Sequence, residues 1–316
     1  MHITLLEPLG VPQAVIDRLS APLLAQGHSF SVCKNARFDA DVIEQAKEAG
    51  AVIVVNRRLG GDVLRALPAL KFVSVAGVAV DKIDCSACRE LGIALSNATD
   101  YATDSVAELT ICLMLTLLRR VTEADEHTRS GGSSAGLTGR QLRGKTVGVV
   151  GTGHVGMQVA RLCRAFGCRV IASAPREKEE ALRLGVTYVP LDELMKEADV
   201  ITLHVPQSEQ TRGLIDGRRI GLMKPSAVLL NLASGAAVDA AALSLALKRG
   251  GISGAAADVY EKEPPLYPGH PLLGAPNMIC TPHIGGMTEE ALLRRAEIAF
   301  ENVAAFLAGR QQNVVL

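Results

Sequence analysis

The sequence predicts an α/β protein built on parallel, doubly wound sheets and divided into two domains. Three observations support this prediction. Short apolar runs alternate with segments of helical spacing along most of the chain, which is typical of parallel strands joined by helices. One such run, residues 146–150, leads directly into a glycine-rich turn. The chain has 316 residues, enough for about two domains of ~150 residues each.

The first ~97 residues predict a small α/β unit of flavodoxin-like type. Apolar runs place its strands at 3–6, 51–55, 70–75 and 91–97, and helical patterns cover 11–19 and 39–49. A tight loop at 76–84 opens a further helix. Residues 289–308 form a last helix of mixed apolar and charged character that can return to this unit. We therefore expect a discontinuous smaller domain over 1–98 and 288–316.

The remaining residues, 99–287, predict a larger domain. One long helix is expected from 103 to 128, and it is apolar nearly all round through Leu118. Such a helix is normally covered by protein, either between domains or between subunits. Residues 130–136 form a flexible surface connection. The strand candidates that follow are 146–150, 169–172, 199–203, 227–231, 252–257 and 277–281.

A Gly-x-Gly-x-x-Gly turn follows the strand at 146–150 and opens a helix. In a Rossmann dinucleotide-binding unit, Gly151 would permit the tight turn and Gly153 would let the backbone approach a pyrophosphate. Gly156 would let the helix pack on the strand. The helix N-terminus presents free N–H groups to phosphate. The alternative is a glycine-rich turn in another kind of α/β unit.

The composition argues against several other classes of protein. Lys and Arg together number 33 and so do Asp and Glu, and aromatic residues are 3% of the chain, so nothing favours binding to nucleic acid. No apolar run reaches the ~20 residues of a membrane span, and the N-terminus lacks the pattern of a signal peptide. The seven scattered cysteines are typical of a reduced, cytoplasmic protein. Cys85 and Cys88 have the spacing of a redox or metal pair, but no second pair follows, and we interpret both as helix residues. We expect no metal site.

Six motifs occur in order along the chain: Gly77-Val78-Ala79-Val80-Asp81-Lys82-Ile83-Asp84, Ser105-Val106-Ala107-Glu108, the glycine turn 151–156, Leu203-His204-Val205-Pro206 with Thr211, the run 257–264, and Thr281-Pro282-His283-Ile284-Gly285-Gly286. In this order they resemble the D-isomer-specific 2-hydroxyacid dehydrogenases, over nearly the whole chain. Residues 55–58 and 97–101 look most like the glycerate, hydroxypyruvate and glyoxylate reductase branch. The resemblance implies an NAD(P)-dependent oxidoreductase that transfers a hydride between nicotinamide and a small 2-hydroxy or 2-oxo acid.

Reduction of a ketone also needs a proton for the carbonyl oxygen, and a protonated imidazole is a natural donor near neutral pH. His283 comes just after an expected strand, where doubly wound sheets bind their ligands. Glu263 can hydrogen-bond this imidazole and stabilise its charged form. The resemblance implies the same two roles. The alternatives are a capping or core histidine and a solvated carboxylate.

The family pattern has an arginine, which binds the substrate carboxylate, immediately before the glycine at 235. This chain has Ser234 instead. Losing a buried charge partner typically costs ~2–5 kcal/mol. Three explanations remain open. In the first, Arg57 or Arg58 takes the role of the missing arginine, although either can be a solvated surface residue. In the second, the substrate is atypical and lacks a carboxylate. In the third, the protein still binds the cofactor but has lost turnover.

By resemblance, the backbone N–H groups of Gly77, Val78 and Ala79 also bind the substrate carboxylate.

An acidic residue is expected ~20 positions after the glycines, but Ala174 occupies that position. Ser173 and Arg176 can bind a 2′-phosphate, so we favour NADP as the cofactor, with NAD as the alternative. Arg176 can instead cap the following helix. The resemblance also implies that Asp258 contacts the nicotinamide carboxamide. Further cofactor-binding candidates are His154, Val155, Val205, Pro206, Thr211, Leu232, Ala233 and Gly285.

Two hypotheses for function follow. The first is a 2-hydroxyacid dehydrogenase-like enzyme that acts as a cytoplasmic homodimer on a small-molecule substrate. The second is a nicotinamide-binding regulatory or interaction protein of reduced activity, since the family includes transcriptional corepressors. His283 and Glu263 favour the first, and Ser234 favours the second.

Overall fold

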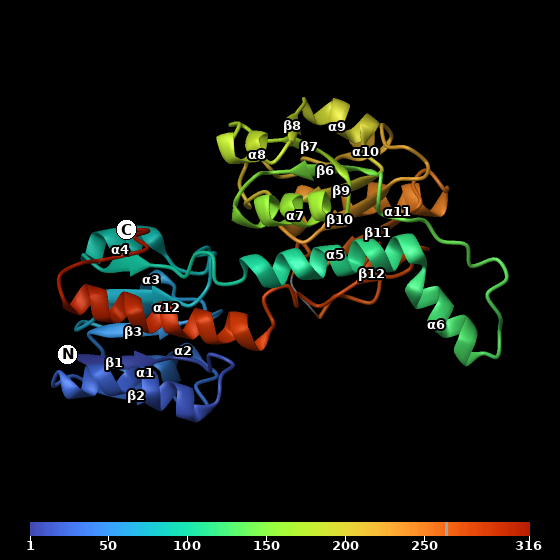
Figure 1. Cartoon of the computed structure of the whole chain (residues 1–316). Helices are drawn as coiled ribbons and strands as arrows, with labels where there is room; N and C mark the ends of the chain where they lie inside the picture. The colour runs from blue at the N-terminus through green and yellow to red at the C-terminus, as the bar shows by residue number, and fades with distance from the viewer. Residues whose placement is uncertain (263–264) are drawn as a thin grey trace. The chain divides into compact units, whose positions relative to one another are not determined.

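The computed structural model describes residues 1–262 and 265–316, and the chain divides into two compact units (Figure 1). Unit 1 contains Met1–Ala102 and Met287–Leu316, and unit 2 contains Thr103–Gly286. The sequence places these divisions at 98 and 288. The first shifts because the chain remains with unit 1 until the helix that starts at Thr103.

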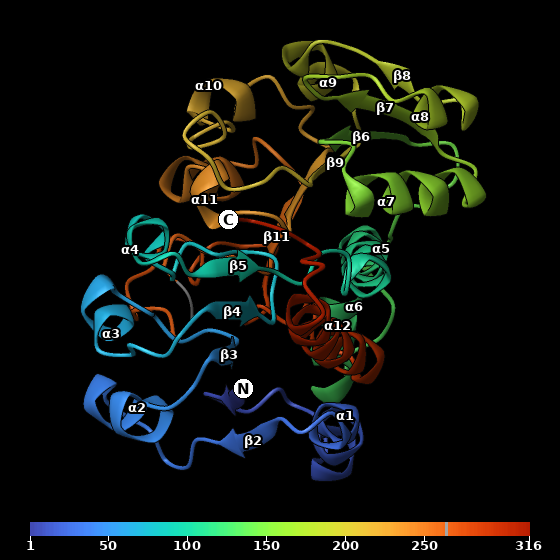
Figure 2. The ribbon, with the colours of Figure 1, turned by 90° about the vertical axis from the view of Figure 1, so that its left-hand side faces the viewer.

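Unit 1 is a parallel sheet with helices on both faces. Its strands are β1 (His2–Leu5), β2 (Ser29–Val32), β3 (Ala51–Val54), β4 (Phe72–Val75) and β5 (Ala94–Ser96), in the order β2-β1-β3-β4-β5. Its helices are α1 (Gln13–Ala25), α2 (Asp39–Ala46), α3 (Gly61–Arg65), α4 (Cys85–Leu91) and α12 (Glu289–Leu307). Figure 2 shows α1 and α12 on one face and α2, α3 and α4 on the other.

Strands β3 and β4 are completely buried and apolar apart from Ser74, which is the pattern of parallel strands covered on both faces. On one side, residues of α1 and α12 such as Ile16, Phe300 and Val303 complete the core. Cys85 and Cys88 lie on α4, as the sequence predicts.

Unit 2 contains a larger parallel sheet in the order β12-β11-β10-β9-β6-β7-β8. Its strands are β6 (Thr146–Val150), β7 (Arg169–Ser173), β8 (Thr187–Tyr188), β9 (Val200–Leu203), β10 (Val228–Asn231), β11 (Gly254–Ala257) and β12 (Met278–Cys280). Its helices are α5 (Thr103–Arg119), α6 (Val121–Arg129), α7 (His154–Ala165), α8 (Glu179–Arg183), α9 (Leu191–Glu197), α10 (Gly217–Ile220) and α11 (Ala240–Lys248). Residues of α5 and α7 pack on one face of the sheet, and residues of α9, α10 and α11 pack on the other.

The structure differs from the sequence prediction at three elements. The expected helix 103–128 is wrong as a single helix, because Arg120 adopts a left-handed conformation with φ 54° and separates α5 from α6. Strands β2 and β8 are not among the expected strands. Strand β2 is partly exposed and carries two serines, and β8 has only two residues, so neither produces a clear apolar run.

Within residues 1–262 and 265–316, no helix combines the length and the hydropathy needed to cross a membrane.

Candidate active site

The candidate site residues of unit 2 gather at one edge of its sheet. Because neighbouring described strands are all parallel, the segments that follow β6, β7, β9, β10, β11 and β12 emerge at the same carboxyl edge. Strand β6 is the first strand of this sheet in the sequence, but it lies in the middle, between β9 and β7. The chain therefore continues to β7 and β8 on one side of β6 and to β9 and the later strands on the other. Such a switch point is where doubly wound sheets bind ligands.

The glycine turn has the geometry that a dinucleotide needs. Gly151 has φ 94°, and a Cβ there would lie 2.5 Å from the carbonyl oxygen of His204. A Cβ on Gly156 would lie 2.0 Å from the carbonyl oxygen of Gly151, so α7 can approach the strand only with glycine at this position. Gly153 is exposed, a Cβ there would have no atom within 4 Å, and His154 begins α7 directly after it. These residues fit a pyrophosphate on the helix N-terminus.

His204 supports the turn from β9. Its backbone N–H donates to the carbonyl of Val150 at 2.8 Å, and its Nε2 lies 2.9 Å from the hydroxyl of Thr202. Burial lowers the pKa of His204 to about 3, so the imidazole stays neutral. The next residue, Val205, also reaches the turn, since its Cγ1 lies 3.2 Å from a Cβ placed on Gly151. Thr211 closes the loop after Val205, and its hydroxyl donates to the carbonyl of Pro206 at 2.6 Å.

The end of β7 is the expected position of the adenosine ribose. Ser173 and Ala174 are half-buried there and Arg176 is exposed. The backbone N–H of Gly151 donates to the carbonyl of Ser173 at 2.9 Å, which ties this end to the glycine turn. Residues 173–176 contain no carboxylate that would repel a 2′-phosphate.

Asn231 fixes the segment that carries Ser234. The Asn231 Nδ2 group donates to the carbonyl of Ser234 at 2.7 Å, and Asn231 Oδ1 accepts the backbone N–H groups of Ala233 and Ser234. Ser234 is 4% exposed, and its Oγ has no hydrogen-bond partner among the described residues. Leu232 beside it is buried, and a Cβ on Gly235 would overlap the backbone of Tyr260. The segment therefore holds a buried hydroxyl at position 234.

Asp258 holds the segment that carries His283. The Oδ1 atom of Asp258 accepts from the hydroxyl of Thr281 at 2.6 Å and from the N–H of Ile284 at 2.8 Å, and its Oδ2 atom accepts from the N–H of Gly285 at 2.8 Å. Between these anchors, His283 has φ 58°, a conformation that costs about 1–2 kcal/mol in a residue other than glycine. Three hydrogen bonds to a buried carboxylate offset that cost and hold His283 after β12.

Asp258 is 1% exposed, and the hydrogen bonds of its carboxylate are to the 281–285 segment. Contact with a nicotinamide carboxamide remains a prediction. Glu263, the expected partner of His283, lies outside the described residues, so this pairing also remains a prediction.

In unit 1, the loop after β4 carries Gly77, Val78 and Ala79. The backbone N–H of Ala98 donates to the carbonyl of Gly77 at 2.9 Å, and Asn97 Nδ2 donates to the carbonyl of Val78 at 2.7 Å. The loop's own N–H groups have no acceptor among the described residues. They fit an anionic ligand, because a bound carboxylate would accept them.

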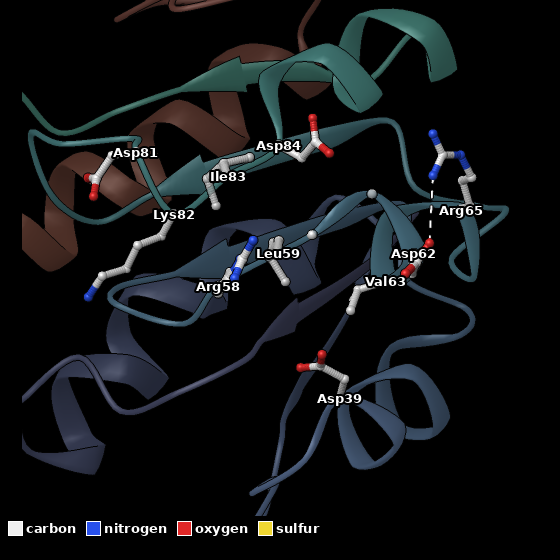
Figure 3. A pocket seen from close by; sticks show the side chains of 12 residues that line it. Asp39, Arg58, Leu59, Asp62, Val63, Arg65, Asp81, Lys82, Ile83 and Asp84 are labelled. Carbon is white, nitrogen blue, oxygen red and sulfur yellow. Dashed lines mark ion pairs between the residues drawn. The ribbon is translucent and has the colours of Figure 1, made fainter.

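Arg57 and Arg58 follow β3 in the same unit. Arg57 donates through Nη2 to the carbonyl of Ala36, and its Nη1 lies 3.8 Å from Asp39, so its guanidinium is directed toward the N-terminus of α2. Arg58 is exposed and lines an open hollow of about 500 Å³ that contains both acidic and basic side chains (Figure 3). Neither arginine is an unpaired, buried cation.

Several residues with structural roles in the site were missed by sequence reasoning. Ser105 donates from Oγ to the carbonyl of Gly285 at 2.6 Å, so it fixes the same segment as Asp258. Glu7, after β1, accepts the N–H groups of Val55, Asn56 and Arg57 through one oxygen, at 2.6–2.7 Å. Ser105 belongs to the motif 105–108, so this motif was a reason to place it near the site. Nothing near Glu7 in the sequence indicates that it binds residues 55–57.

The described residues contain no group of three His, Cys, Asp or Glu side chains that could hold a metal ion.

Comparison with known proteins identifies the family. Residues 111–285 match the model of the D-isomer specific 2-hydroxyacid dehydrogenase, NAD binding domain. A glyoxylate reductase of Aeropyrum pernix is 38% identical over 279 residues, covering 85% of this chain and 83% of that protein. A D-3-phosphoglycerate dehydrogenase of Methanocaldococcus jannaschii is 41% identical over 280 residues, or 87% of this chain, but the chain spans only 53% of that protein.

A solved structure of similar fold is an acyclic imino acid reductase in complex with NADPH and D-Arg, with a TM-score of 0.87, 28% identity and all of both chains covered. The matched domain contains the glycine turn, Ser234 and the segment held by Asp258. The chain therefore belongs to the D-isomer specific 2-hydroxyacid dehydrogenase family, whose members are oxidoreductases acting on CH–OH groups.

Proposed function

We propose that this protein reduces a small 2-oxo acid, of the size of glyoxylate or hydroxypyruvate, to its 2-hydroxy acid with NADPH. The observation that carries the proposal is the Asp258 network, which holds His283 in a left-handed conformation at the carboxyl edge of the sheet. The same edge carries the glycine turn. The similarity to a glyoxylate reductase supports the choice of a small oxo acid.

The residues of unit 2 fit a nicotinamide dinucleotide. Gly151, Gly153 and Gly156 with the N-terminus of α7 would hold the pyrophosphate, because a side chain at 151 or 156 would overlap backbone atoms. The further candidates are His154, Val155, Val205, Pro206, Thr211, Leu232, Ala233, Asp258 and Gly285. When bound, the reduced cofactor supplies the hydride that adds to the carbonyl carbon of the substrate.

The chain's own residues supply the proton and the binding groups. Protonated His283 donates its proton to the carbonyl oxygen as negative charge develops there, and Glu263 stabilises the protonated imidazole. Asp258 positions the His283 backbone through the N–H groups of Ile284 and Gly285. The N–H groups of Gly77, Val78 and Ala79 bind the substrate carboxylate.

The preference for NADP over NAD rests on the end of β7. Ala174 stands where an acidic residue would accept the ribose hydroxyls, and Ser173 and Arg176 offer donors to a 2′-phosphate. The fold neighbour that reduces imino acids is itself a complex with NADPH.

A panel of 2-oxo acids with NADPH and with NADH, followed at the nicotinamide absorbance, tests the proposal. Turnover of glyoxylate or hydroxypyruvate, faster with NADPH, is the expected result. The His283→Gln variant serves as the control, since it should bind cofactor but lose turnover. An absence of turnover with every oxo acid and both cofactors would contradict the proposal.

A second candidate function is nicotinamide binding with little or no turnover, and Ser234 favours it. Ser234 presents a buried hydroxyl at the position where the resemblance to the family predicts an arginine, and serine carries no positive charge. If the parent is inactive with every oxo acid and the Ser234→Arg variant gains activity, this second function is correct. Activity in the parent excludes it.

We further propose that the protein is a cytoplasmic homodimer. Its seven cysteines are free thiols, which fits a reducing compartment. Helix α5 keeps partly exposed apolar residues such as Leu115 and Leu117, which fits a subunit contact. Light scattering after gel filtration would give twice the 33.3 kDa chain mass for a dimer.

A further inference from the structure

We propose that Arg295 binds the carboxylate of the substrate, which is the task that Ser234 cannot perform. The inference rests on the proposed reduction of a 2-oxo acid and names the cation that this reduction needs. A carboxylate bound only by backbone N–H groups would keep its full negative charge unpaired. A guanidinium supplies that charge together with parallel donors that match two carboxylate oxygens.

Arg295 lies on α12 and is a half-buried arginine without an acidic partner. Its Nη2 donates to the carbonyl of Leu9 at 2.8 Å, and its Cζ lies 5.8 Å from the ring centroid of Tyr101. Its Nε is buried and has no hydrogen-bond partner. Within the part of the chain that the structure describes, no carboxylate forms an ion pair with it.

An arginine has five N–H donors and is always charged. Leaving a buried donor of a charged group unsatisfied costs more than a typical hydrogen bond contributes. The contacts of Arg295 hold the guanidinium in place but satisfy little of its hydrogen-bonding capacity: one carbonyl accepts from Nη2, and Cζ lies over the Tyr101 ring. An oriented cation with an unpaired donor is suited to receive an anion.

The register of α12 on the sheet places the backbone of Arg295 at the end of β4 that leads into the loop with Gly77, Val78 and Ala79. Ser74 in β4 donates from Oγ to the carbonyl of Ala299 at 3.0 Å, and Phe72 stacks on Phe306 with ring centroids 4.4 Å apart. Helix α12 therefore runs antiparallel to β4. Arg295, one turn before Ala299, falls beside the carboxyl end of β4, where the loop 76–79 begins.

The segment 97–101 links the loop after β4 to helix α12. Ala98 and Asn97 donate to the carbonyls of Gly77 and Val78, and Asn302 of α12 donates from Nδ2 to the carbonyl of Asn97 at 2.9 Å. Tyr101, which faces Arg295, follows three residues after Ala98. The guanidinium and the loop's free N–H groups thus belong to one connected edge of unit 1.

The neighbouring arginines do not meet these conditions. Arg57 contacts the Ala36 carbonyl and Asp39, and Arg58 is exposed in the hollow of Figure 3. Arg294, next to Arg295 on α12, is exposed and pairs with Glu297 and Glu301. Arg294 therefore provides a matched control on the same helix.

The test compares Arg295→Met with Arg294→Met in steady-state kinetics with glyoxylate and with hydroxyacetone, which has a carbonyl but no carboxylate. We expect Arg295→Met to lower kcat/KM for glyoxylate by about 30-fold to 1,000-fold, mainly through KM, and to leave the rate with hydroxyacetone and the melting temperature nearly unchanged. Arg294→Met should behave as the parent. Added guanidinium ion, or a second substitution Ser234→Arg, should restore part of the lost activity.

The outcomes separate this inference from the proposed function. If the parent reduces glyoxylate and Arg295→Met retains its KM, Arg295 is a structural residue and the inference is wrong. The inference is also wrong if Arg295→Met slows both substrates equally, because the loss is then not specific to the carboxylate. If the parent reduces no oxo acid, the proposed function itself fails. Oxalate binding measured by calorimetry, expected in the parent and weakened in Arg295→Met, then tests the carboxylate site without turnover.

Discussion

The carboxylate of Asp258 accepts the backbone N–H of Ile284 at 2.8 Å, so the residue directly after His283 is fixed by a residue 26 positions earlier. Together with the hydrogen bond from the N–H of Gly285 at 2.8 Å, this contact fixes the backbone position from which the His283 side chain extends. The proposed proton donor is thus placed by a buried carboxylate.

Replacing Asp258 with asparagine should reduce turnover by about 10-fold to 100-fold. Asparagine replaces one carboxylate oxygen with an NH2 group, which cannot accept the N–H that Gly285 or Ile284 now donates. A lost hydrogen bond to a charged group costs ~1.5–3 kcal/mol. Steady-state kinetics and thermal unfolding of Asp258→Asn provide the measurement. Asp216→Asn is the control: this carboxylate caps α10, where asparagine substitutes well. Normal kcat in Asp258→Asn would refute a role in positioning His283.

His204 should make stability fall as the solution becomes acidic. Its folded-state pKa of about 3 lies below the ordinary value of 6.5, so the unfolded chain takes up the proton first. Above pH 6.5 the ring is neutral in both states and has no effect. Between pH 6.5 and 3, the free energy of unfolding loses up to ~1.4 kcal/mol per pH unit through this group.

Urea unfolding at pH 7 and pH 5 checks this expectation. His204→Gln should lose about 2 kcal/mol less than the parent between these two values. His127→Gln, at an exposed position on α6, should follow the parent. An identical pH dependence in His204→Gln and the parent would mean that His204 is not held neutral.

The glycine turn should respond differently to alanine at its second and third glycines. At Gly156, a Cβ would lie 2.0 Å from the carbonyl oxygen of Gly151, so Gly156→Ala should shift the backbone, at a cost of ~1–3 kcal/mol in stability. It should also abolish cofactor binding. At Gly153 no atom lies within 4 Å, so Gly153→Ala should keep the parent's melting temperature and weaken NADPH binding by roughly 10-fold, since the methyl group takes space expected for phosphate.

Melting curves and fluorescence titration with NADPH distinguish the two glycine variants. If Gly156→Ala and Gly153→Ala lost the same amount of stability, the close packing at Gly156 and the open space at Gly153 would be contradicted.

A carboxylate at position 174 should reverse the preferred cofactor. Ala174→Asp places a negative charge where the 2′-phosphate of NADPH is expected, and an acidic residue there can accept the ribose hydroxyls of NADH. The ratio of kcat/KM for NADPH to that for NADH should fall by about 100-fold, because placing like charges together costs several kcal/mol. Glu177→Gln, an exposed neighbour, is the control. An unchanged ratio in Ala174→Asp would place the ribose elsewhere.

The sequence predicts well those elements whose signal is local. Strand β6 occupies the expected residues 146–150, since a buried parallel strand is a continuous apolar run followed here by glycine. Helix α12 also lies within one residue of its expected range. The break at Arg120 is invisible in the sequence, because a left-handed conformation in an arginine has no signature in composition or spacing.

The same division applies to the candidate site. Motif spacing points to the 281–285 segment and to the glycine turn. The residues that hold them are less apparent. Asn231 stands in the sequence pattern only as the end of a strand, although it fixes Ser234. Arg295 contacts Leu9 across 286 positions, and no periodic pattern encodes such a contact. Long-range polar contacts require the fold before they can be identified.

The order of strands in the larger sheet has a consequence for how the protein loses activity. Strand β6, with the glycine turn, is central, whereas β12, which precedes His283, pairs with β11 at the border of the sheet. Disruption of that border strand would displace His283, the proposed proton donor, while the middle of the sheet keeps its neighbours on both sides. We therefore expect changes at this border strand to abolish turnover while dinucleotide binding at β6 persists.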